Sequence, residues 1–195
     1  CTGDDADGRA DTLKMIQARV EKKDPAAINM LGERYSEGMY GLQKSMLQAV
    51  KLWEEAAELG SVKALFNLGV AYYSGLGVRQ DEAKGAKFYK KAAVQGHAES
   101  RYRLGVMGGM HGNYRSSYRH LLISANMGHE RSIALIRMTV IDGLATKEQY
   151  TEALKGYQDA VEDMKSPERD QAKAFVEEMK SPERDEAKAL KALYG

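Results

Sequence analysis

Residues 61–96 read SVKALFNLGVAYYSGLGVRQDEAKGAKFYKKAAVQG, and this stretch decides the fold. A segment with glycines in its middle separates two runs of apolar residues at helical spacing, which predicts a helix–turn–helix unit. A Leu-Gly pair occurs three times, 37 and 36 residues apart, as Leu31-Gly32, Leu68-Gly69 and Leu104-Gly105. A closing glycine also occurs three times, 36 and 32 residues apart, as Gly60, Gly96 and Gly128. A period in this range predicts an array of stacked helical hairpins.

The small and aromatic residues of this stretch resemble a Sel1-like repeat, a relative of the tetratricopeptide repeat with a longer loop between its two helices. The resemblance rests on Ala64, Leu68-Gly69, Tyr72, Gly75, Gly77, Ala83, Tyr89, Ala92-Ala93 and Gly96. It covers residues 24–160. It implies an all-α fold, an α/α superhelical solenoid of TPR-like helix–turn–helix repeats that binds other proteins on its concave face.

The remaining segments are expected to flank this array. Residues 1–10 are small and acidic, which favours a disordered linker, and an N-terminal capping helix is expected at 11–23 with Asp11 or Thr12 as its N-cap. The array divides into four repeats, at residues 24–60, 61–96, 97–128 and 129–160. The third repeat has lost the usual glycine spacing of its loop, so a plain tetratricopeptide hairpin is expected there.

Residues 161–195 contain a second, unrelated repeat. VEDMKSPERDQAKAF at 161–175 recurs as VEEMKSPERDEAKAL at 176–190, with a Ser-Pro-Glu helix start in each copy. The pattern predicts a tail of short helices with a 15-residue tandem duplication. Two interpretations stay open: an extended C-terminal cap, or phosphorylation at Ser166 and Ser181, each of which precedes a proline.

Charge is unevenly distributed along the chain, although the total is only +1. Residues 61–96 and 97–141 each carry +4, whereas residues 1–60 carry −3 and residues 142–195 carry −4. A basic centre favours an acidic or amphipathic protein segment as partner. The alternative is that most of these charges lie on solvated outer helix faces. Nucleic acid is a less favoured partner, because no nucleic-acid-binding motif accompanies the charge.

Neither a catalytic motif nor a cofactor motif is found, and we expect no enzyme, no cofactor and no metal site. His129-Glu130 begins like a zinc-protease motif, but Ile133 stands where the second histidine belongs. Cys1 is the single cysteine, which excludes an internal disulfide and favours a reducing compartment such as the cytoplasm. No apolar run is long enough for a membrane span.

The resemblance also implies which residues bind the partner. If the geometry follows tetratricopeptide repeats, positions two, five, nine and twelve of each first helix face the ligand. These concave-face candidates are Asn29, Glu33, Ser36, Lys63, Phe66, Val70, Tyr73, Glu99, Tyr102, Val106, Arg131, Ala134 and Met138.

Three functional hypotheses follow from these observations, the third and least favoured being nucleic-acid binding through the basic central repeats. The first is a non-enzymatic adaptor or scaffold that binds proteins through the concave face. The second is a substrate-binding or regulatory module of a larger protein, such as a RING-type ubiquitin ligase whose zinc-binding domain lies upstream of Cys1.

Overall fold

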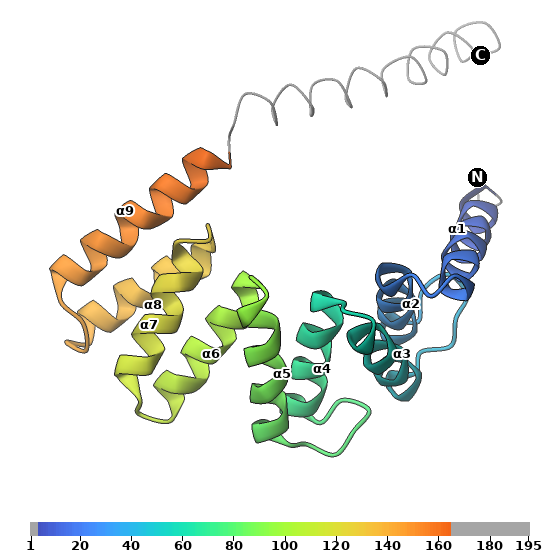
Figure 1. The fold of residues 1–195 in the computed structure, drawn as a ribbon, viewed down its shortest axis with the longest axis horizontal. Helices are drawn as coiled ribbons and strands as arrows, with labels where there is room; N and C mark the ends of the chain where they lie inside the picture. The colour runs from blue at the N-terminus through green and yellow to red at the C-terminus, as the bar shows by residue number, and fades with distance from the viewer. Residues whose placement is uncertain (1–3, 165–195) are drawn as a thin grey trace, which may run out of the picture. The chain divides into compact units, whose positions relative to one another are not determined.

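The computed structural model describes residues 4–164, with side chains described from Arg9 onward. This part of the chain is all helical, which confirms the predicted all-α fold (Figure 1). Its helices are α1 (Asp4–Glu21), α2 (Pro25–Glu37), α3 (Met46–Glu58), α4 (Val62–Ser74), α5 (Glu82–Val94), α6 (Ala98–Met110), α7 (Tyr114–Ala125), α8 (Glu130–Ile141) and α9 (Lys147–Asp163). Cys1, Ser166, Ser181 and the duplicated segment after residue 164 lie outside the described residues.

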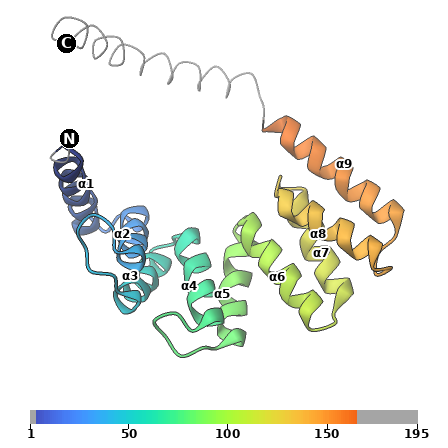
Figure 2. The ribbon, with the colours of Figure 1, turned by 180° about the vertical axis from the view of Figure 1, so that it is seen from behind.

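The helices group into two units, divided between Ser124 and Ala125. In the N-terminal unit, α2 pairs with α3 and α4 with α5, while α3 packs on α4 and α5 on α6 (Figure 2). Helix α1 packs against α2 and buries Ile16. In the C-terminal unit, α8 and α9 form a hairpin around Ile133, Ile136 and Ala153. The N-terminal unit is therefore a stack of helical hairpins.

Most helices begin at polar residues that cap them. Asp24 accepts hydrogen bonds from the backbone N–H groups of Ala26 and Ala27, as expected for an Asp-Pro helix start. Ser45 accepts a hydrogen bond from the backbone N–H of Gln48 at the start of α3. Thr146 and Gln149 form a complete capping box at the start of α9.

Helix α1 begins before the expected position. It starts at Asp4, so residues 4–10 are helical rather than linker, and neither Asp11 nor Thr12 is its N-cap. No proline occurs between residues 1 and 24, so the backbone can stay helical once the buried Ile16 anchors the helix. Sequence reasoning placed the boundary by polarity, which does not by itself end a helix.

The first helices of the first three hairpins, α2, α4 and α6, each carry a glycine where a large side chain of the second helix packs. A Cβ atom built at Gly69 would lie 2.5 Å from Tyr89 ring atoms, and one at Gly32 would lie 2.6 Å from Trp53 Nε1. At Gly105 the corresponding distance to Leu121 is 2.7 Å. A side chain at any of these positions would force the helices apart. The repeated Leu-Gly pairs therefore mark the close contacts inside each hairpin.

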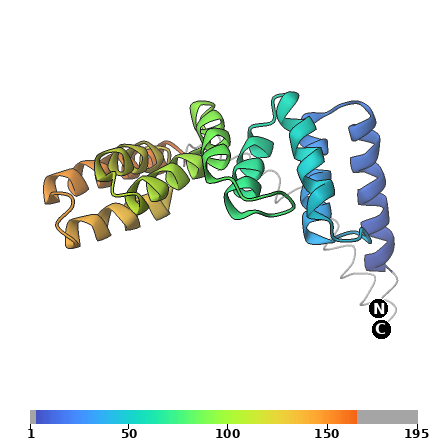
Figure 3. The ribbon, with the colours of Figure 1, turned by 90° about the horizontal axis from the view of Figure 1, so that it is seen from below.

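The loops within the hairpins differ in length. Residues 75–81 form a long loop between α4 and α5, visible in Figure 3, where Gly75 and Gly77 have φ of 70° and 72°. By contrast, only residues 111–113 separate α6 from α7. The third hairpin thus has the short loop that its lost glycine spacing predicts.

Candidate protein-binding groove

Two pockets lie between α2 and α4 on the first-helix side of the N-terminal unit. The larger, of about 490 Å³, is lined by Ser36, Lys44, Met46, Trp53, Phe66, Asn67, Val70, Ala71, Leu76 and Arg103. The smaller, of about 320 Å³, is lined by Pro25, Ala26, Asn29, Met30, Glu33, Ser61, Val62 and Lys63. We call the two pockets together the α2–α4 groove.

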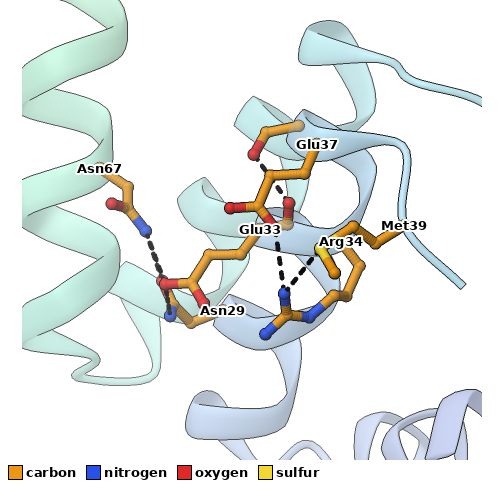
Figure 4. A network of polar contacts seen from close by, with 7 residues as sticks. Asn29, Glu33, Arg34, Glu37, Met39 and Asn67 are labelled. Carbon is orange, nitrogen blue, oxygen red and sulfur yellow. Dashed lines mark hydrogen bonds and ion pairs between the residues drawn. The ribbon is translucent and has the colours of Figure 1, made fainter.

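A polar network connects the two pockets (Figure 4). Asn67 of α4 donates to Asn29 Oδ1 at 3.0 Å and approaches Glu33 Oε1 at 3.4 Å. Asn29 in turn donates to Glu33 Oε1 at 3.0 Å. Because Asn29 is only 3% exposed, these bonds replace water for a buried amide. The network fixes the spacing of α2 and α4, and thus the width of the groove.

The larger pocket combines an apolar lining with two cationic side chains. Phe66 and Leu76 supply apolar surface, and Trp53, which is only 5% exposed, forms part of the pocket floor. Phe66 is held by ring contacts to Tyr89 and His97, with centroids 5.8 Å and 4.8 Å away. Lys44 and Arg103 also line the pocket, and Arg103 Nε donates to Glu99 at 2.9 Å. Such a lining suits an apolar side chain with a carboxylate near it.

Six of the predicted groove residues line these pockets. Ser36, Phe66 and Val70 belong to the larger pocket, and Asn29, Glu33 and Lys63 to the smaller one. Asn29 and Glu33 face one another across the network rather than standing free, so part of their polarity is already used.

The other predicted residues are placed differently. Tyr73 is half-buried against the cluster of Tyr89, Ala93 and Leu104. Glu99 and Tyr102 both contact Arg103, the latter with the guanidinium 6.0 Å from the ring centroid, and Val106 is half-buried on α6. Three more lie exposed on α8 of the C-terminal unit and line neither pocket: Arg131, Ala134 and Met138.

Sequence reasoning missed several residues of the larger pocket. Lys44 precedes α3, Met46 and Trp53 lie on α3, and Leu76 lies in the loop after α4. They were missed because the prediction counted positions on first helices alone. A usable signal was present in Leu76, an apolar residue between two loop glycines, which is 43% exposed.

Other kinds of site find little support in the described part of the chain. Between residues 4 and 164, no three His, Cys, Asp or Glu side chains are grouped as a metal ion would require. Over the same range, no helix combines the length and apolarity that a bilayer crossing demands.

The stacked hairpins, with their glycine contacts, define an α-helical repeat protein. A family model described as the Sel1 repeat matches residues 25–61, 62–97 and 98–129, which together make up more than half of the chain. The chain therefore belongs to the Sel1 repeat family, and the resemblance drawn from residues 61–96 is confirmed.

Similar curated proteins come from fungi and a plant. Protein SHC1 of Saccharomyces cerevisiae is 33% identical over 82 residues, which are 42% of this chain and 16% of that protein. Chitin synthase regulatory factor 3 of Schizosaccharomyces pombe is 29% identical over 83 residues, 43% of this chain and 9% of that protein. The ERAD-associated E3 ubiquitin-protein ligase component HRD3B of Arabidopsis thaliana is 33% identical over 84 residues, 41% and 14% of the two chains. The matches thus span 16% or less of these curated relatives.

Solved structures of the same kind cover more of this chain. A protective antigen of uropathogenic Escherichia coli strains, which displays an SLR fold, has a TM-score of 0.65 at 25% identity and covers 80% of this chain and 34% of its own. A Sel1 repeat protein from Oxalobacter formigenes has a TM-score of 0.61 at 28% identity, with coverages of 80% and 68%.

Proposed function

We propose that this protein is a non-catalytic adaptor that binds a segment of another protein in the α2–α4 groove. Membership of the Sel1 repeat family supports a role in protein interaction. The names of two relatives, a chitin synthase regulatory factor and a ubiquitin-ligase component, describe proteins that act together with other proteins. The larger pocket carries the proposal, because it presents apolar surface that the hairpins leave uncovered.

The lining of the groove favours an amphipathic, acidic segment. Phe66 and Leu76, above the buried Trp53, would receive an apolar anchor, since aromatic and aliphatic anchors supply most of the affinity at protein interfaces. Lys44 and Arg103 beside this pocket, with Lys63 in the smaller one, would attract carboxylates and speed association.

A matched pair of leucine variants tests the proposal. Leu76 lines the larger pocket and Leu59 lies outside both pockets, yet they are 43% and 42% exposed. Partners captured from a lysate of the source organism would be identified by mass spectrometry and their binding measured by calorimetry. Leu76→Asp should weaken binding at least tenfold, because it places a carboxylate in an apolar pocket. Leu59→Asp should bind normally. Equal binding by both variants would place the interface elsewhere.

A second candidate is a substrate-binding or regulatory module of a ubiquitin ligase. The similarity to the ligase component HRD3B favours it. In that case the captured partners should include ubiquitin-ligase subunits or their substrates, and Leu76→Asp should remove them. If the captured proteins are unrelated to ubiquitin ligases but still require Leu76, the ligase module is excluded and the general adaptor function remains.

A further inference from the structure

At one junction between hairpins, two apolar positions of the repeat are replaced by the basic residues Arg101 and His120. The helices repeat with offsets of 36 residues from α4 to α6 and 32 residues from α5 to α7. Arg101 therefore stands where the second repeat has Leu65, which is 6% exposed. By the same offsets, His120 stands where the second repeat has Phe88. Both replacements occur at one junction, between the second and third hairpins.

The preceding junction shows what the repeat normally builds at this place. There, Leu65 and Phe88 line a pocket of about 330 Å³ that also contains Glu54 and Glu58. One repeat later, Lys90 takes the place of Glu54 and Val94 that of Glu58. Lys91, the cation of that pocket, is replaced by Ile123. The charged or basic side chains at this place thus change from two glutamates and one lysine to Lys90, Arg101 and His120.

The cationic groups at this junction have no counter-charge among the described residues. Arg101 Nε and His120 Nδ1 are both buried without a hydrogen-bond partner there. Lys90 is exposed close by, and its charge acts on His120. Burial lowers the pKa of His120, and the positive charges of Arg101 and Lys90 lower it further. His120 is therefore neutral at neutral pH, beside the two cations Arg101 and Lys90, whose effect on it no carboxylate opposes.

Without a bound ligand, this arrangement lowers the free energy of unfolding. A buried nitrogen without a partner loses the free energy of its hydrogen bonds to water, and a partly buried cation without a counter-ion adds to that loss. Leucine and phenylalanine at the same positions show that the repeat can fill the space without charge. An anion at this place would accept hydrogen bonds from Arg101 Nε and from protonated His120, and the exposed Lys90 ammonium would attract it.

We propose that Lys90, Arg101 and His120 form a binding site for an oxyanion, a phosphate or carboxylate group presented by a ligand. The site is separate from the α2–α4 groove, since none of its three residues lines that groove. It uses one side chain from each of three consecutive helices, α5, α6 and α7, so it exists only when the second and third hairpins are stacked (Figure 1).

The experiment follows the imidazole of His120 in the full chain by NMR while inorganic phosphate or acetate is added. Chloride at matched ionic strength serves as the control for simple screening. Bound oxyanion should raise the pKa of His120 from its lowered value and raise the thermal midpoint in a saturable way. A larger response to phosphate identifies a phosphate site, and an equal or larger response to acetate identifies a carboxylate site.

Three variants separate this site from general effects of charge. Arg101→Leu restores the residue of the second repeat, and should fold with equal or greater stability while losing the oxyanion response. Lys90→Gln should reduce the response, whereas Lys87→Gln, an exposed lysine on the same helix, should not. The proposal fails if His120 does not respond, if chloride acts equally, or if Arg101→Leu responds like the parent.

Discussion

Gly69 of α4 lies directly against the ring of Tyr89 of α5, and a Cβ atom at Gly69 would be 2.5 Å from both Cδ1 and Cε1 of that ring. Tyr89 itself is 2% exposed and packs with Ala93 and Leu104 at the junction with the next hairpin. One missing side chain therefore determines both how closely α4 and α5 approach and where the next hairpin packs.

The first prediction compares two glycines inside helices. Gly69→Ala should lower the free energy of unfolding by about 1–3 kcal/mol, because the methyl group overlaps the Tyr89 ring. At Gly109 the nearest atom to an added Cβ is Ser117 Oγ at 3.4 Å, an ordinary contact. Gly109→Ala should therefore be neutral or stabilise by up to about 1 kcal/mol through helix propensity. Denaturant unfolding measures both, and an unchanged Gly69→Ala variant would contradict the close packing.

The second prediction concerns alkaline pH. Burial raises the pKa of Tyr89 to about 12 from an ordinary value of 10.0. The folded state thus holds this proton more tightly than the unfolded state. The contribution of protonated Tyr89 to the free energy of unfolding is therefore complete below pH 10 and is lost as pH rises toward about 12. Unfolding experiments across this window should show a steeper loss for the parent than for Tyr89→Phe. If the free energies of unfolding of the parent and Tyr89→Phe change in parallel with pH, ionisation of Tyr89 does not contribute to the loss of stability.

The third prediction tests the polar network of the groove. Asn67→Ala removes the donor to Asn29, whose buried amide oxygen cannot recruit water freely. The free energy of unfolding should fall by about 1–3 kcal/mol, the usual cost of leaving a buried polar group unsatisfied. Gln43→Ala, in an exposed loop, is the control and should change stability little. Calorimetry measures the free energy of unfolding of both variants. Equal changes in the two would mean that the network makes no measurable contribution to stability.

The fourth prediction concerns acid pH. The hydrogen bond from Arg19 holds the pKa of Asp24 below its ordinary 3.8, and the N–H groups of Ala26 and Ala27 act in the same direction. The stabilising effect of the ionised Asp24 carboxylate is therefore complete above pH 3.8 and is lost as pH falls through the lowered pKa. Asp24→Asn keeps a capping oxygen but not the charge.

This variant should be less stable than the parent near neutral pH and should approach it in acid. Asp11→Asn, which breaks the exposed pair with Lys14, is the control and should have little effect at any pH. Thermal unfolding followed against pH measures the difference. If the difference in thermal midpoint between the parent and Asp24→Asn is the same at all pH values, the geometry of the cap rather than its charge determines the stabilisation.

The sequence by itself determined the helices, their caps and the hairpin repeat. Asp24-Pro25, Thr146 with Gln149, and the recurring Leu-Gly pairs act through neighbours within a few residues or at a fixed period, so their effect can be read along the chain. The contact of Gly69 with Tyr89 follows the same repeat, because Gly32 and Gly105 contact a large side chain of their own second helix, Trp53 and Leu121, in the same way.

Only the tertiary structure decided which side chains share a surface. Lys44, Trp53 and Leu76 come from a loop, a second helix and another loop, and no local pattern joins them to Phe66 in one pocket. Similarly, Arg101 and His120 look like ordinary surface residues in the sequence, and their buried nitrogens emerge only when two hairpins are stacked. Helix formation depends on nearby residues, whereas pockets and uncompensated charges depend on what distant residues leave uncovered.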